Sequence, residues 1–156
     1  MAQANRLAMT MAPRSRTLTA DVNAGATLVP AVQGMKHRLV DFTMIAIGGA
    51  AGGATSVDII GTRAGVAVRL AVVTVAALTQ SAAVKPNSAN VTLLADGASH
   101  TPLDENTAIT IGRQSGGSDL TTATAIDCVL VYLLHEDRQR RAGAVGVVVD
   151  SSDLGR

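Results

Sequence analysis

The chain has 156 residues, with 13 basic side chains, 12 acidic ones and a formal net charge of +1. That balance gives no overall field to hold nucleic acid or an anionic membrane surface, so we expect neither as a partner. Only 1% of the residues are aromatic although 47% are hydrophobic, which argues against ring-stacking sites for sugars or single-stranded nucleic acid. The N-terminus has no apolar leader, and the longest apolar stretch (70–78) has about half the length of a membrane span. We expect a soluble protein made in a cytoplasm.

Apolar residues recur in alternating or continuous runs that are broken by Gly, Asn, Pro and Ser, and helical periodicity is nearly absent. The runs predict strands over 17–22, 26–32, 35–47, 55–60, 65–77, 91–95, 107–112 and 122–134. This number of short strands with frequent turns indicates an all-β fold, an antiparallel β-sandwich or jelly roll. We expect its core to include Val72, Ile126, Cys128 and Leu130.

Composition changes sharply at both ends. We therefore expect an N-terminal arm over 1–16, a β-sandwich domain over 17–134 and a C-terminal arm over 135–156 with a possible added strand. That strand is "AVGVVVD" (144–150), which needs an edge to pair with, either in its own subunit or in a neighbour. The candidate interaction residues in the two arms are Arg6, Arg14, Arg16, Arg138, Arg140, Arg141, Val147, Val148 and Val149.

Two predicted strands carry apolar residues on both faces. In "TAIDCVLVYLL" (124–134) one face contains Cys128 and Leu130, and the other contains Val129 and Val131. A sandwich usually exposes its outer face to water, so cleaner alternation would be expected. Either a second layer or another protein chain must cover these outer faces. We favour another chain, because the sequence offers no helix as a cover.

Two glycine-rich segments resemble phosphate-binding loops in spacing. Gly48 and Gly53 have the separation of the Walker loop, but Ala54 replaces its lysine and strand-like residues follow. Segment 112–119 repeats the pattern with Ser118 in the lysine position. We interpret both as connections between strands and expect no nucleotide or other cofactor.

Other candidate chemistry is sparse. Cys128, the only cysteine, is expected to be a buried apolar side chain, and the "KHR" segment around His37 a solvated strand edge. The loop over 96–105 brings together two aspartates, a glutamate and His100; a metal or acid–base site is conceivable there, but a hydrated polar loop is favoured. We expect no catalytic site and no metal site, and a small hydrolase using this loop is a distant third possibility.

The segments "KHRLVDFTMIAIGGAAGGATSVDIIGT", "AALTQSAAVKPNSANVTLLADGASHTPLDENTAITIG" and "LTTATAIDCVLVYLL" resemble decoration (cement) proteins of tailed-bacteriophage heads, which have jelly-roll-like domains. The resemblance covers roughly residues 17–134 and rests on strand spacing and an Ala/Thr/Val/Gly-rich style. It implies a structural virion protein on the capsid exterior that bridges neighbouring subunits of the major capsid protein. We also expect self-association into a homo-oligomer. The alternative is a phage tail or fibre domain that attaches to the host.

Overall fold

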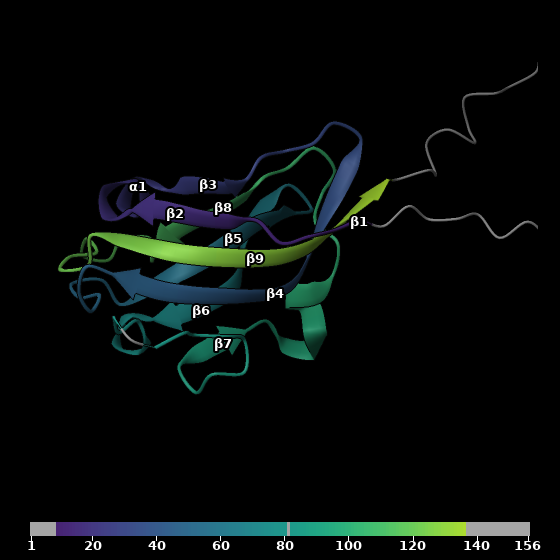
Figure 1. Ribbon diagram of the computed structural model, residues 1–156. Coiled ribbons are helices and arrows are strands. Elements are labelled where there is room, and N and C mark those ends of the chain that lie inside the picture. Colours follow the sequence, from purple (N-terminus) through teal and green to yellow (C-terminus); the bar gives the residue numbers. More distant parts are fainter. Residues whose placement is uncertain (1–8, 81, 137–156) are drawn as a thin grey trace, which may run out of the picture.

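A computed structural model describes residues 9–80 and 82–136, which form two antiparallel β-sheets packed as a sandwich (Figure 1). In sheet A, β9 (Ala125–Glu136) is central, with β4 on one side and β1 and then β2 on the other. The remaining strands of sheet A are β1 (Met9–Met11), β2 (Arg14–Leu18) and β4 (Met35–Ile47). Sheet B has the order β3 (Ala26–Val29), β8 (Ile109–Arg113), β5 (Ser56–Arg63), β6 (Val66–Thr74) and β7 (Val91–Leu93). The predicted all-β sandwich is confirmed.

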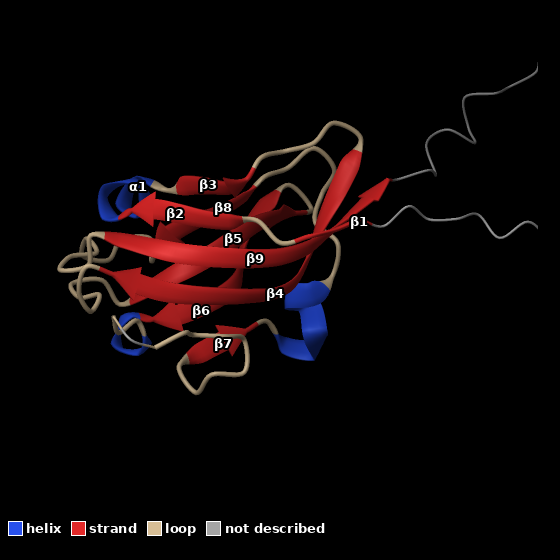
Figure 2. Ribbon diagram, viewed as in Figure 1, coloured by secondary structure: helices blue, strands red, loops and turns tan. Residues whose placement is uncertain are grey.

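Helical structure among the described residues is confined to short segments in the connections (Figure 2). These are the α-helix α1 (Thr19–Ala24) and the 3₁₀ segments η1 (Val75–Ala77) and η2 (Ala95–His100). The outer face of sheet A therefore receives no helix from the described part of the chain.

The core lies between the two sheets and is built almost entirely from aliphatic side chains. Ile126, Cys128 and Leu130 of β9 are buried there, as predicted. Val72 was also predicted in the core, and this prediction is wrong: Val72 is half-buried, whereas Val73 is fully buried. The cause is a β-bulge, in which Ile59 pairs with Ala71 while Ile60 pairs with Arg69, so that β6 holds one extra residue. One extra residue reverses which side chains face the core from that point onward.

The prediction of a strand over 17–22 is also wrong, because β2 ends at Leu18 and α1 begins at Thr19. The Asn23 side chain holds this single turn in place through two hydrogen bonds with the backbone of Leu120: Nδ2 donates to the carbonyl at 3.1 Å, and Oδ1 accepts from the amide at 2.7 Å. Val22 packs into the core beneath it. The turn stops at Gly25, whose φ of 86° favours glycine. Contacts distant in sequence, rather than local periodicity, therefore define α1.

Strand β1 and the first part of β2 lie within the segment expected to be an N-terminal arm (1–16), and β9 continues to Glu136. Sheet A thus extends beyond both expected domain boundaries, because β9 is long enough to pair with β1 and β2 end to end. Arg6 and residues 137–156 lie outside the described residues. These include the predicted interaction residues Arg138, Arg140, Arg141, Val147, Val148 and Val149.

The glycines of the first glycine-rich segment allow two loops to pack closely. A Cβ on Gly53 would lie 2.4 Å from the carbonyl oxygen of Asp119, and one on Gly48 would lie 2.3 Å from Thr124 Oγ1. Both glycines have φ near +78°, a conformation that other residues adopt only with strain. Gly52 and Thr121 form a backbone bridge between the same loops. The first glycine-rich segment connects β4 to β5, as predicted, and its glycines allow the two loops to pack closely.

Candidate interaction surface

The outer face of sheet A follows from the alternation of side chains along β9. Cys128 and Leu130 point into the core, so Val129, Val131 and Leu133 point outward. In β4, Ile45 pairs with Asp127 and therefore lies on the same outer face. The sequence had predicted this second apolar face but left open whether a second layer covers it. In the described part of the chain, no second layer does.

The apolar members of this surface are half-buried by their neighbours rather than enclosed. Two side chains beside them are more exposed: Leu18 on β2 (58% exposed) and Val40 at the bulge in β4 (41% exposed). Neighbouring apolar side chains in this position mark interfaces more often than free surface. We define the outer apolar surface as Leu18, Val40, Thr43, Ile45, Ile47, Val129, Val131 and Leu133.

A charged cluster lies within this surface. Asp127 is 5% exposed, and its carboxylate receives hydrogen bonds from Arg16 Nε at 2.7 Å, from Arg16 Nη2 at 3.0 Å and from Arg14 Nη2. The pKa of Asp127 is lowered from 3.8 to about 2. The main cause is the hydrogen bond from Arg16, and Arg14 adds to it, whereas burial acts in the opposite direction. Two guanidinium groups share one carboxylate, so the cluster carries one excess positive charge. The side chains of both arginines remain more than half exposed.

The structure brings together two of the predicted interaction residues, Arg14 and Arg16, on adjacent outward positions of β2. It also adds Asp127, which sequence reasoning did not select. A signal for Asp127 was present, because it is the one charged residue inside the apolar run 123–134. A buried carboxylate in such a run needs a cationic partner. Spacing alone did not reveal that the partners lie near the opposite end of the chain.

The loop over 96–105 uses its polar groups to join loops and strands. Asp104 accepts hydrogen bonds from the backbone amides of Ala64 (3.0 Å) and Gly65 (2.8 Å), and these lower its pKa. His100 Nδ1 lies 3.2 Å from the Leu39 carbonyl oxygen, and Arg38 Nε donates to the His100 carbonyl. No group of three or more potential metal-binding side chains occurs among residues 9–80 and 82–136. These contacts give the loop a structural role.

His37 was expected at a solvated strand edge, but its side chain is fully buried. Nδ1 lies 2.9 Å from the Thr107 carbonyl oxygen, and the ring makes an edge-on contact with Tyr132 at 5.4 Å between centroids. Burial lowers the pKa of His37 below 6.5. The expectation failed because the residues flanking His37 are basic, whereas its own position on β4 faces the core.

Cys128 is buried as predicted, and burial raises the pKa of its thiol to about 12. Such a thiol is protonated at neutral pH and lacks the reactivity of a thiolate. Its place in the core beside Met44, its register partner on β4, is that of a small apolar side chain.

Comparison of the chain with protein-family models, with curated protein sequences and with solved structures gives no match. Within the described residues, no helix has the length and apolar character required to cross a bilayer.

Proposed function

We propose that the chain is a structural virion protein that decorates the outside of a phage head, bridges neighbouring subunits of the major capsid protein, and has no enzymatic activity. The observation that carries the proposal is the outer apolar surface, which the described part of the chain leaves without a covering layer. The resemblance of residues 17–134 to phage decoration proteins supplies the biological setting.

The arrangement of this surface suits binding spread over a wide area. Aliphatic side chains occupy the central strand β9 and its neighbour β4, and the arginines of β2 lie on the other side of β9. Protein interfaces commonly have an apolar centre and a polar rim, and arginine is enriched in them relative to the rest of the protein surface. The excess positive charge of the Arg14–Arg16–Asp127 cluster favours a partner surface that carries a carboxylate.

The test uses purified virions from an infection in which the chain is produced. Quantitative mass spectrometry should find the chain in many copies per particle, at a fixed ratio to the major capsid protein. Only a few copies would favour the alternative, a tail or fibre attachment domain. Absence of the chain from virions would overturn both proposals.

A pair of valine substitutions tests the surface itself. Val131→Asp places a charge within the outer apolar surface, and it should abolish co-sedimentation with particles while leaving the circular dichroism spectrum unchanged. Val66→Asp is the matched control, because Val66 is 63% exposed at the start of β6 in the other sheet. Undiminished binding by the folded Val131→Asp variant would contradict this assignment of the surface.

A further inference from the structure

Strand β2 is an open edge of sheet A. Its one strand neighbour among the described residues is β9, through the register Arg14↔Val129 to Leu18↔Ala125. Two backbone hydrogen bonds flank this register: Leu130 N–H to the Pro13 carbonyl (3.2 Å) and Thr19 N–H to the Thr124 carbonyl (3.1 Å). In an antiparallel pair these bonds recur at every second residue, so Ser15 and Thr17 direct their backbone groups toward β9. The backbone groups of Arg14, Arg16 and Leu18 therefore point outward from the edge.

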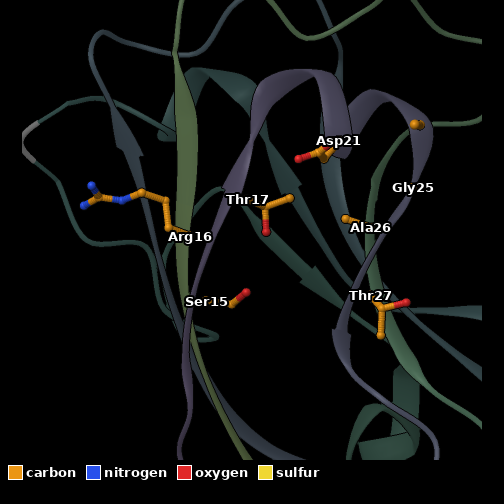
Figure 3. Close-up of a pocket in the computed structure, with 8 residues that line it drawn as sticks. Ser15, Arg16, Thr17, Asp21, Gly25, Ala26 and Thr27 are labelled. Carbon is orange, nitrogen blue, oxygen red and sulfur yellow. The ribbon is translucent and has the colours of Figure 1, made fainter.

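A shallow groove of about 310 Å³ runs beside this edge, between β2 and β3, and α1 closes one end (Figure 3). Small side chains line it, notably Ser15 and Thr17 from β2 and Ala26 and Thr27 from β3. Asp21 lies at the α1 end, and the Arg16 guanidinium points away from β3 toward the outer face of sheet A (Figure 3). An open strand edge next to a groove with small lining side chains can accept an additional strand.

We propose that this edge binds residues 144–150, "AVGVVVD", of a second copy of the chain, as a strand antiparallel to β2. The inference goes beyond the proposed function, because it concerns association between copies of the chain and requires no capsid. Three arguments select this occupant: its alternation, its flanking charges and its reach.

The alternation of the segment fits the two sides of the edge. Val145, Val147 and Val149 share one side of an extended strand, and Gly146, Val148 and Asp150 share the other. When Asp150 lies opposite Arg14, the first set points into the groove beside Ser15 and Thr17. Small β-branched side chains suit a groove of this size, and the exposed backbone groups of β2 gain hydrogen-bond partners.

The charges fix the direction of the added strand. The segment follows a basic run that contains Arg138, Arg140 and Arg141, and it ends at Asp150. At the edge, Arg14 and Arg16 lie at the start of β2, whereas Asp21 lies at the α1 end and makes no ion pair with the other described residues. An antiparallel strand places Asp150 near the excess positive charge of the arginines and its basic flank toward Asp21. A parallel strand would reverse both pairings.

The chain between Glu136 and Ala144 is too short for residues 144–150 to reach the β2 edge of the same copy. Strand β9 ends at Glu136, at the end of the sandwich opposite α1 (Figure 1). The distance along β9 from Glu136 back to Ala125, the register partner of Leu18, is about 36 Å at roughly 3.3 Å per residue. With Asp150 opposite Arg14, Ala144 must lie farther from Glu136 than Leu18 does. The chain from Glu136 to Ala144 spans at most about 29 Å when fully extended. In this orientation the strand must therefore come from a second copy.

Disulfide trapping in the full-length chain tests the register. Leu18 is exposed on the outer side of β2, away from the buried Cys128, so Leu18→Cys leaves the core intact. A mixture of Leu18→Cys chains and Gly146→Cys chains should form a cross-linked heterodimer under mild oxidation. The matched control is Val147→Cys, which points into the groove and should cross-link to Leu18→Cys at least tenfold less. A chain carrying both Leu18→Cys and Gly146→Cys should give species linked between chains.

Each outcome decides the inference. Equal cross-linking of the 146 and 147 variants, an intrachain link in the double variant, or no cross-link at roughly 100 µM protein would overturn it. As a second readout, Val147→Asp should abolish the cross-link and leave a monomer in analytical ultracentrifugation, whereas unchanged association would also overturn the inference. If the variants cross-link but the chain is absent from virions, this inference stands and the proposed function fails. If the chain is present in virions but the variants do not cross-link, the proposed function stands and this inference fails.

Discussion

Arg16 and Asp127 form a two-point contact between strands β2 and β9, although they lie 111 residues apart in the chain. Arg16 Nε donates to Oδ1, and Arg16 Nη2 donates to Oδ2, so the guanidinium and the carboxylate meet edge to edge. The contact ties the N-terminal part of sheet A to its central strand. It also keeps a buried carboxylate charged on the face that we assign to binding.

We expect this contact to make stability depend on acid pH. The pKa of Asp127 is about 2 in the folded protein against an ordinary value of 3.8, so its contribution is complete above about pH 4 and is lost as the pH falls toward 2. We expect about 1 kcal/mol, because the exposed arginines are screened by solvent. Urea unfolding at pH 2 to 6 measures it. Asp127→Asn should unfold more easily at pH 6 and show a flatter pH dependence; an unchanged slope would contradict the assignment.

His37 predicts a second, separate pH dependence. Burial lowers its pKa in the folded state, so the unfolded chain binds a proton more readily as the pH falls through about 6.5. Stability should therefore decrease from pH 7 toward pH 5. His37→Phe removes the titrating group while retaining a ring beside Tyr132, and it should flatten the unfolding free energy over this range. If the variant and the parent protein show the same slope, another group is responsible.

Cys128 should behave as a reporter of unfolding. Its thiol is buried and its pKa is raised to about 12, so a thiol reagent should label native protein slowly at pH 8. In denaturant, labelling should reach one thiol per chain within the mixing time. Leu18→Cys provides the matched control, because its added thiol lies on an exposed position and should react at once in the native state. Fast labelling of the parent protein would show that β9 opens locally.

Two glycine substitutions should separate backbone strain from steric overlap. Gly65 and Gly53 have φ of 74° and 79°, but nothing lies within 4 Å of a Cβ on Gly65, whereas a Cβ on Gly53 meets the Asp119 carbonyl oxygen. We expect Gly65→Ala to cost about 1 kcal/mol through strain alone. Gly53→Ala should cost about 2 to 4 kcal/mol, because overlap adds to the strain. Equal changes in the free energy of unfolding would mean that the two loops separate without penalty.

The strands that the sequence predicted best are those whose pairing is regular over a long distance. The range 35–47 of β4 matches the prediction in full, and the core side of β9 was assigned correctly. Alternation failed where the chain inserts an extra residue, as at Leu70, because a bulge depends on the pairing with β5. It failed again at Thr19–Ala24, where Asn23 fixes one helical turn through a loop distant in sequence.

The interaction surface was only partly predictable for a similar reason. The apolar outer side of β9 is visible in "CVLVYLL", and the arginines near the N-terminus were selected by charge. That Arg14 and Arg16 meet Asp127 depends on the register between β2 and β9. No local pattern specifies a pairing between segments so distant in the chain. The burial of His37 likewise depends on which side of β4 faces the core.

The central position of β9 has a consequence for synthesis of the protein. Strands β1, β2 and β4 all pair with β9, yet they leave the ribosome before it. Because Arg16 and Asp127 are 111 residues apart, translation at about 5 to 20 residues per second leaves β2 without its partner for roughly 5 to 20 seconds. Sheet B can begin earlier, because the β5–β6 hairpin closes locally. During that interval, the apolar strand β4 is the segment of the nascent chain most in need of protection from aggregation.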